Sequence, residues 1–142
     1  MKDSIVREKS FKFALRIIKL ADHLSEKRAF ILADQVLRSG TGIGSNVYEA
    51  AVAVSHKELI SKSSIAHKKA HETYYWLMLL RKSEKIEKKA ADSLIKDCDE
   101  RCRILASFIK TARQNRRDEE RTLLFILHSA FFIRWNCFIS AF

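Results

Sequence analysis

Apolar residues recur every three or four positions along most of this chain, which is the spacing of one face of an α-helix. The first such run follows Asp3 or Ser4, either of which can cap a helix, and continues to about Leu24. The recurring apolar positions of this predicted helix are Phe11, Ala14, Leu15, Ile18, Ala21 and Leu24. The polar stretch 25–28 reads as a connection, and a second helical run extends from near Ala29 to about Val54. The pattern therefore predicts two helices joined by a short link.

The stretch 55–58, SHKE, has the pattern of a capping box. The Ser55 hydroxyl can accept from the amide three residues on, while Glu58 reaches back to the Ser55 amide. A third helix is predicted from here to about Leu80, and a fourth from roughly Lys88 to Gln114, after a turn at 81–87. Four amphipathic helices with short links predict an all-α protein, an antiparallel up-down four-helix bundle over residues 1–115.

All three glycines lie in one stretch, RSGTGIGSNVYEA at 38–50, which raises the alternative of a phosphate-binding loop. Such a loop needs a preceding strand and the spacing GxGxxG or GxxxxGK[ST], whereas here the spacing is GxGxG and the preceding residues are helical in period. At about 100° per residue, an apolar stripe continues through the segment without a break in phase. We predict that the stretch is helical, with a close approach of another helix compensating for the glycines.

Beside this apolar stripe runs a polar seam that we single out as the candidate interaction site. Its members are Gln35, Arg38, Ser39, Gly42, Asn46 and Glu49. One interpretation is a structural seam that fixes helix register or holds subunits together, with Glu49 pairing with Arg38. The other is a ligand or RNA contact, with Arg38 on a phosphate and Asn46 on a base or sugar. The structural interpretation is favoured because Glu49 would repel a phosphate.

The predicted third helix is apolar on more than one side, which indicates a subunit or partner interface in addition to the bundle core. Its first stripe is Leu59, Ser63, Ala66, Ala70, Thr73, Leu77 and Leu80, and its second is Ile60, Ser64, His67, His71, Tyr74 and Met78. Trp76 falls near the far side, among charged residues. The predicted interface residues are His67, His71, Tyr74, Trp76 and Met78.

Candidate chemistry is sparse. His67 and His71 share a helix face but have no HExxH pattern and no evident third ligand, so we predict no metal site there, and protonation of the pair could make assembly pH-sensitive. Cys98 and Cys102, spaced CxxxC, are predicted to fill core positions. No catalytic constellation or cofactor fingerprint stands out, so we expect neither an enzyme nor a bound cofactor.

Composition adds a charge argument. The 142 residues carry 27 Lys and Arg against 17 Asp and Glu, a formal net charge of +10, with no proline. The excess favours an anionic partner, nucleic acid or a membrane surface, although a solvated basic surface explains it equally well. Three cysteines and a charged N-terminus favour a reducing, cytoplasmic location.

The C-terminal residues depart from this pattern. A charged linker, 116–121, precedes a hydrophobic tail, 122–142, whose length suits a membrane span. His128, Arg134 and Asn136 lie inside it, and a central Arg costs about 2.5–3.5 kcal/mol on insertion scales. The tail is expected to be an additional helix packed on the bundle, a membrane anchor, or a run-on from a shifted reading frame. Left bare, it would aggregate.

The residues Gln35, Arg38, Ser39, Ile43, Asn46, Glu49 and Ala50 follow the pattern Q-x-x-R-S-x-x-S-I-x-x-N-x-x-E-[AG]. In this and in stretches 55–80 and 97–113, the chain resembles the small bacterial four-helix bundle proteins named for intervening sequences of 23S ribosomal RNA. Gly42 stands where that family usually has serine. The resemblance, over about residues 5–115, implies an up-down bundle that in some relatives forms a homopentameric ring, with a suggested nucleic-acid or ribosome connection.

Together these arguments predict a cytoplasmic, self-assembling bundle that acts as a scaffold or adaptor. The family resemblance implies that this homo-oligomer is a ring. RNA is the favoured anionic partner, through Lys and Arg at the helix ends. The alternatives are a purely structural or protein-partner module and a membrane-tethered bundle anchored by the tail.

Overall fold

Four helices follow one another along the chain. The computed structural model describes the backbone of residues 2–140 and the side chains of residues 5–128. The helices are α1 (Lys2–Glu26), α2 (Phe30–Ala51), α3 (His56–Lys82) and α4 (Lys88–Ser140), and residues 2–140 contain no β-strand. The chain divides into two compact units, Met1–Ile109 and Lys110–Phe142, with α4 contributing to both. The all-α prediction is confirmed.

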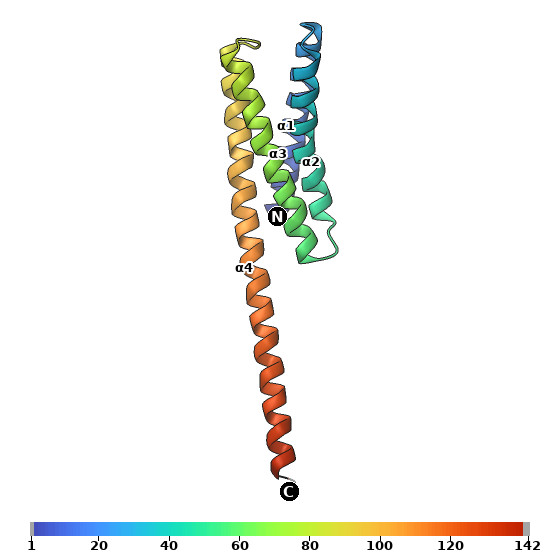
Figure 1. Ribbon diagram of the computed structural model, residues 1–142, viewed down its shortest axis with the longest axis vertical. Helices are drawn as coiled ribbons and strands as arrows, with labels where there is room; N and C mark the ends of the chain where they lie inside the picture. The colour runs from blue at the N-terminus through green and yellow to red at the C-terminus, as the bar shows by residue number, and fades with distance from the viewer. Residues whose placement is uncertain (1, 141–142) are drawn as a thin grey trace. The chain divides into compact units, whose positions relative to one another are not determined.

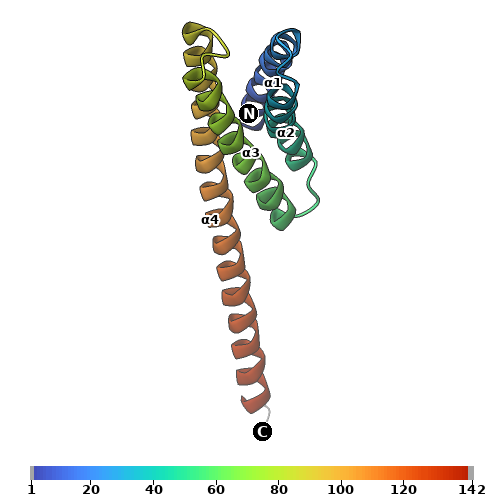
Figure 2. The same ribbon diagram turned by 45° about the horizontal axis from the view of Figure 1, so that its top comes forward.

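The first unit is an antiparallel bundle in which the chain reverses direction at each connection (Figures 1 and 2). Helix α2 packs against both α1 and α3. The first part of α4 contacts α3 through the Cys98 thiol, which donates to the Ala70 carbonyl at 3.2 Å, and contacts α1 through an Arg16–Asp97 ion pair. Each helix therefore has two neighbours, as the up-down prediction requires.

The core is built from one side of each helix and is almost entirely apolar. Its largest fully buried side chains include Phe13, Ile17, Leu24, Val36, Ile43, Leu77, Leu80 and Leu105. The predicted first stripe of the third helix supplies six buried residues, from Ser63 to Leu80. Ser63 and Thr73 are accommodated there because their hydroxyls donate to carbonyls one turn back, Leu59 at 2.7 Å and Lys69 at 2.8 Å.

Helix α1 buries a face that includes only two of the predicted positions, Ala21 and Leu24. Its core residues are Phe13, Ile17, Leu20, Ala21 and Leu24. Of the predicted apolar positions, Phe11 is 54%, Leu15 46% and Ile18 41% exposed. The prediction is wrong for these three because α1 is apolar on two sides, and periodicity alone does not tell which side meets the other helices.

Two connections close in the same way without a glycine. After α1, the Ala29 amide donates to the Leu24 carbonyl at 2.8 Å and the Arg28 amide to the Ser25 carbonyl at 2.9 Å. After α3, the Lys85 amide donates to Leu80 at 3.1 Å and the Glu84 amide to Arg81 at 3.3 Å. Arg28 and Glu84 have φ of 58° and 54°. Both are Schellman motifs, whose left-handed residue is usually glycine.

The start of α3 confirms half of the predicted capping box. The Ser55 hydroxyl accepts from the Glu58 amide at 3.1 Å, as predicted. The Glu58 carboxylate, however, accepts from the Val54 amide at 3.0 Å and so satisfies the residue before the cap. Helix α2 ends at Ala51, three residues earlier than predicted, which leaves Val54 in the connection. Helix α1 begins at Lys2, so the predicted caps Asp3 and Ser4 lie inside it, and their side chains are outside the described residues.

Helix α4 continues well past Gln114, where the sequence pattern ends it. The stretch 116–121 is helical, and the backbone remains helical to Ser140. Pairs one turn apart support it, with Gln114 donating to Asp118 at 3.0 Å and Arg116 lying 3.2 Å from Glu120. A polar stretch without proline or glycine can remain helical, so the predicted end was wrong.

Candidate functional site

The polar seam lies on α2 along its boundary with α3. Ser39 is buried, Gln35, Gly42 and Asn46 are half-buried, and Arg38 and Glu49 are exposed. Two contacts locate the boundary: Glu49 forms an ion pair with Lys62 of α3, and a Cβ placed on Gly42 would lie 3.4 Å from the Lys69 side chain. The sequence pattern that carries the family resemblance therefore follows one helix–helix contact.

Buried polar groups of the seam are satisfied within α2 itself. The Ser39 hydroxyl donates to the Gln35 carbonyl at 2.9 Å, and the Asn46 amide donates to the Gly42 carbonyl at 2.8 Å. Arg38 and Glu49 do not pair with one another within this chain: Arg38 lies 3.9 Å from Asp34, and Glu49 pairs with Lys62. Eleven residues of helix separate them by roughly 16 Å, too far for a contact within one helix.

The predicted close helix approach occurs at Gly40, and the phosphate loop is excluded because the whole stretch is helical. A Cβ at Gly40 would come within 2.7 Å of the Ile17 side chain in α1. At Gly44 it would lie 3.7 Å from the Ser10 carbonyl oxygen. Of the three glycines, Gly40 is therefore the one at which the close packing of α1 against α2 leaves no room for a side chain.

Half-exposed side chains line the second face of α3. His67, Tyr74 and Met78 are half-buried, and His71 is exposed. Trp76 does not lie on the far side of α3 as its position suggested, because it is half-buried and packs against the core. Its indole N–H is buried without a hydrogen-bond partner among the described residues. The predicted interface residues therefore occupy two sides of α3.

His67 and His71 form a direct pair one helical turn apart. Their Nε2 atoms are 3.2 Å apart, and the rings meet edge to face with centroids at 4.6 Å. Burial lowers the pKa of His67, and the nearby His71 lowers it further. No group of three or more His, Cys, Asp or Glu side chains suited to a metal occurs among the described residues.

Cys98 and Cys102 lie in the core, as predicted. The Cys102 thiol and burial both raise the pKa of Cys98. A protonated, buried thiol is a poor nucleophile, so Cys98 has the surroundings of a core residue.

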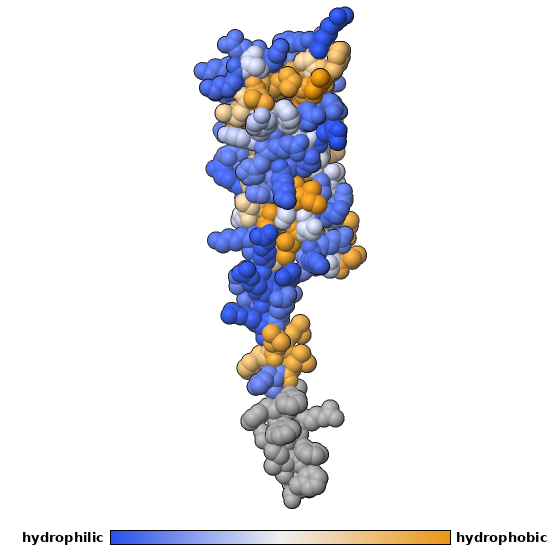
Figure 3. All heavy atoms as spheres, viewed as in Figure 1, coloured by the Kyte–Doolittle hydropathy of each residue, from blue (hydrophilic) through white to orange (hydrophobic). Residues whose placement is uncertain are grey.

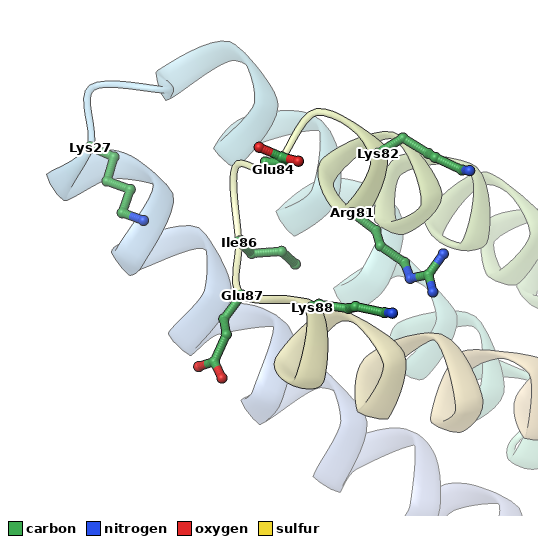
Figure 4. A pocket seen from close by; sticks show the side chains of 7 residues that line it. All are labelled: Lys27, Arg81, Lys82, Glu84, Ile86, Glu87 and Lys88. Carbon is green, nitrogen blue, oxygen red and sulfur yellow. The ribbon is translucent and has the colours of Figure 1, made fainter.

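Sequence reasoning did not identify a basic cluster at the end of the bundle where α1 meets the α3–α4 connection. An open pocket of about 830 Å³ is lined there by Lys27, Arg81, Lys82, Glu84, Ile86, Glu87 and Lys88 (Figure 4). The Lys27 ammonium donates to the Lys85 carbonyl at 3.5 Å, and Arg81 lies 2.5 Å from Asp92. The charged runs at the end of α1 and around the α3–α4 connection are visible in the sequence. Only the fold shows that the two runs lie close together.

The second unit consists of α4 from Lys110 onward. Its charged residues up to Arg121 are exposed, and they are followed by the exposed apolar residues Leu123, Leu124, Phe125, Ile126 and Leu127 (Figure 3). His128 is also exposed, whereas Arg134, Asn136 and Cys137 lie outside the residues whose side chains are described. Over the described part of the chain, no helix combines the length and the apolar character that a membrane span requires.

Comparison with known proteins gives a family and similar solved structures. The family described as 23S rRNA-intervening sequence protein matches residues 2–107. A protein of unknown function from Bacteroides thetaiotaomicron, whose crystal structure is described as belonging to the S23 ribosomal protein family, is 43% identical. The match covers 78% of this chain and 99% of that one, with a TM-score of 0.75. No curated protein matches the chain.

Proposed function

The chain belongs to the family of 23S rRNA-intervening sequence proteins, and from this premise we propose that it is a non-enzymatic helical scaffold that assembles with further copies of itself. The observation that carries the proposal is the outer face of α1. Phe11, Leu15 and Ile18 follow one another at i, i+4 and i+7 on one side of that helix, and all three are substantially exposed.

This α1 face (Phe11, Leu15 and Ile18) lies away from the core residues Phe13 and Ile17 of the same helix. Single exposed apolar residues need no explanation, but a stripe of three with an aromatic member is typical of a contact surface. A homo-oligomer would bury it. The half-exposed second face of α3 supplies a further surface for the same purpose.

The non-enzymatic part of the proposal rests on the described side chains. Acidic residues that contact other helices do so as ion pairs, such as Asp97 with Arg16 and Glu49 with Lys62. The seam hydroxyl and amide groups bond to their own helix. Such groups are engaged in holding the fold, which supports a non-enzymatic role.

Light scattering after size-exclusion chromatography tests the proposal. We expect the full chain to give a discrete oligomer and the double variant Phe11→Ser, Ile18→Ser to give a monomer with an unchanged helical circular dichroism spectrum. Val54→Ser is the matched control, since Val54 is 94% exposed but lies in the α2–α3 connection. A full chain that is monomeric at tens of micromolar would refute self-assembly.

A second candidate function is RNA binding, favoured by the net charge of +10 and by the basic cluster at the bundle end (Lys27, Arg81, Lys82 and Lys88). These four cations lie beside Glu84 and Glu87, and Arg81 is paired with Asp92, which leaves a small excess of positive charge. Phosphate contacts release counterions, so an RNA complex should weaken steeply as salt rises.

Fluorescence anisotropy with a labelled structured RNA, measured at several salt concentrations, tests RNA binding. Lys27→Gln with Lys82→Gln should lower the affinity and flatten the salt dependence, whereas Lys19→Gln with Lys68→Gln, which removes the same charge from exposed positions elsewhere, should change it less. Equal losses in both pairs would show that only overall charge matters. Binding without salt dependence, or none at all, would favour a purely structural or protein-partner module.

A further inference from the structure

The His67–His71 pair of α3 has a geometry that helical spacing alone does not ensure. Two side chains four residues apart share a face, but their rings can point in different directions. Here the two Nε2 atoms lie 3.2 Å apart, within hydrogen-bonding distance. Only one hydrogen can lie between two neutral imidazole nitrogens, so one Nε2 necessarily presents its lone pair toward the other.

That separation matches the bite of a chelated metal ion. Zinc–nitrogen bonds of about 2.0–2.1 Å at a tetrahedral angle place the two nitrogens roughly 3.3 Å apart. The observed separation of 3.2 Å already matches this distance. Chelation requires that the rings turn so that both Nε2 lone pairs face the same ion. The predicted absence of a metal site rested on the missing third protein ligand. A site with two protein ligands, in which the other coordination positions of the ion are open, does not require a third.

The accessibility of the pair suits a cation. His71 is exposed and His67 half-buried, so an ion can reach the pair without opening the bundle. Because no third His, Cys, Asp or Glu joins the pair among the described residues, water would occupy the other positions.

We propose that His67 and His71 chelate one divalent transition-metal cation per chain, of the class of Zn²⁺, Ni²⁺ or Cu²⁺, with water completing its coordination. Imidazole nitrogen is a favoured ligand for these ions. Binding links two successive turns of α3 at its half-exposed face, and it requires that both turns be helical. The ion therefore stabilises the folded chain by mass action.

Isothermal titration of the full chain with nickel chloride, and separately with zinc chloride, tests the site. We expect one ion per chain. His71→Gln should weaken binding at least tenfold, because it removes one of two ligands while the exposed position leaves the fold intact. His23→Gln is the matched control, since His23 is exposed on α1, and it should leave the affinity unchanged. Equal affinity in His71→Gln and the original chain would overturn the proposal.

A second measurement separates this site from the thiols of Cys98 and Cys102. Proton–nitrogen NMR correlation spectra of the imidazoles, recorded with added zinc chloride, should shift the Nε2 resonances of His67 and His71 and leave that of His23 in place. The thermal midpoint should rise with zinc in the original chain and in His23→Gln, and stay constant in His71→Gln. A zinc-dependent rise in His71→Gln equal to that of the original chain would assign the ion elsewhere and refute the pair as its site.

Discussion

The backbone of Gly40 lies against the side chain of Ile17, so close that a Cβ at residue 40 would come within 2.7 Å of both Cγ atoms of that isoleucine. Ile17 is fully buried and β-branched, and its side chain has little freedom to move aside. This contact explains why a glycine stands in the middle of a long helix, where it costs about 1 kcal/mol relative to alanine.

Gly40→Ala is therefore expected to destabilise the protein, whereas Gly44→Ala should stabilise it. Overpacking at residue 40 costs about 1–3 kcal/mol, against a helix-propensity gain of about 1 kcal/mol. At residue 44 the nearest atom would be at 3.7 Å, an ordinary contact, so a gain of up to about 1 kcal/mol should remain. Urea denaturation of both variants measures the difference, and a stabilised Gly40→Ala would contradict the close approach.

Arg101 should contribute more to stability than a neighbouring surface arginine. Its guanidinium is buried between α4 and α1, donates to the Lys9 carbonyl at 3.0 Å and to Glu100 at 2.9 Å, and lies 5.3 Å from the Phe13 ring centroid. Because hydrogen bonds to charged groups are worth about 1.5–3 kcal/mol, Arg101→Met should lose about 2–3 kcal/mol of unfolding free energy.

The control for Arg101 is Arg103→Met, two residues along the same helix. The Arg103 side chain is exposed and pairs with Asp99 at 2.7 Å, and exposed pairs contribute about 0–1 kcal/mol. Denaturant unfolding should separate the two variants clearly. Equal losses would mean that the α1–α4 contacts of Arg101 carry no net stability.

Arg28→Gly should stabilise the turn between α1 and α2. Arg28 has a left-handed backbone, with φ of 58°, which costs an L-residue roughly 1–2 kcal/mol and glycine almost nothing. Glycine also has greater entropy in the unfolded chain, which offsets part of this gain. The unfolding free energy is therefore expected to rise by about 0.5–1 kcal/mol. Lys27→Gly in the same turn serves as the control. It should destabilise the protein, because Lys27 does not have a positive φ and glycine there relieves no strain. A loss of thermal stability in Arg28→Gly would count against the Schellman geometry.

Stability should decline as the solution is acidified through the range just below pH 6.5, in part because of His67. Burial and His71 place the pKa of His67 in the folded chain below its usual value, about 6.5, in the unfolded chain. Above pH 6.5 His67 is neutral in both states and contributes nothing. Below it the unfolded chain takes up the proton first, so the folded state loses stability until the pH has passed the lower pKa.

His67→Gln should therefore lose less unfolding free energy than the original chain between pH 7.5 and pH 5. NMR titration of the His67 ring gives the pKa directly, and His71→Gln should raise that pKa only in part, since burial is the larger cause. A His67 ring that titrates at or above pH 6.5 would contradict the half-buried surroundings of His67.

Local patterns were sufficient for much of the fold. The helical phase through the glycine stretch, the Ser55 cap and the core stripe of α3 from Ser63 to Leu80 all follow from residues close in the chain. Each depends on interactions within one or two helical turns, which is why sequence spacing predicts them. The polar seam also follows helical spacing along one side of α2, whereas its boundary with α3 became evident only in the fold.

Other features depended on which helices meet. Helix α1 has two apolar sides, and only packing against α2 and α4 decided that Phe13 and Ile17 are buried while Phe11 and Ile18 are exposed. The sequence therefore predicted this helix correctly but assigned Phe11, Leu15 and Ile18, the face proposed for assembly, to its buried side. The basic cluster at the bundle end arose in the same way, from two connections more than fifty residues apart.

By itself, then, the sequence determined the helices, most of their boundaries and the family, because backbone hydrogen bonds, caps and helical periodicity are local. The tertiary structure alone decided which side of α1 is buried, the contact of Gly40 with Ile17, the burial of Arg101 and the ring orientations of His67 and His71. These depend on distances between groups far apart in the chain, or on rotamers that neighbouring helices select, and no pattern along a single helix contains them.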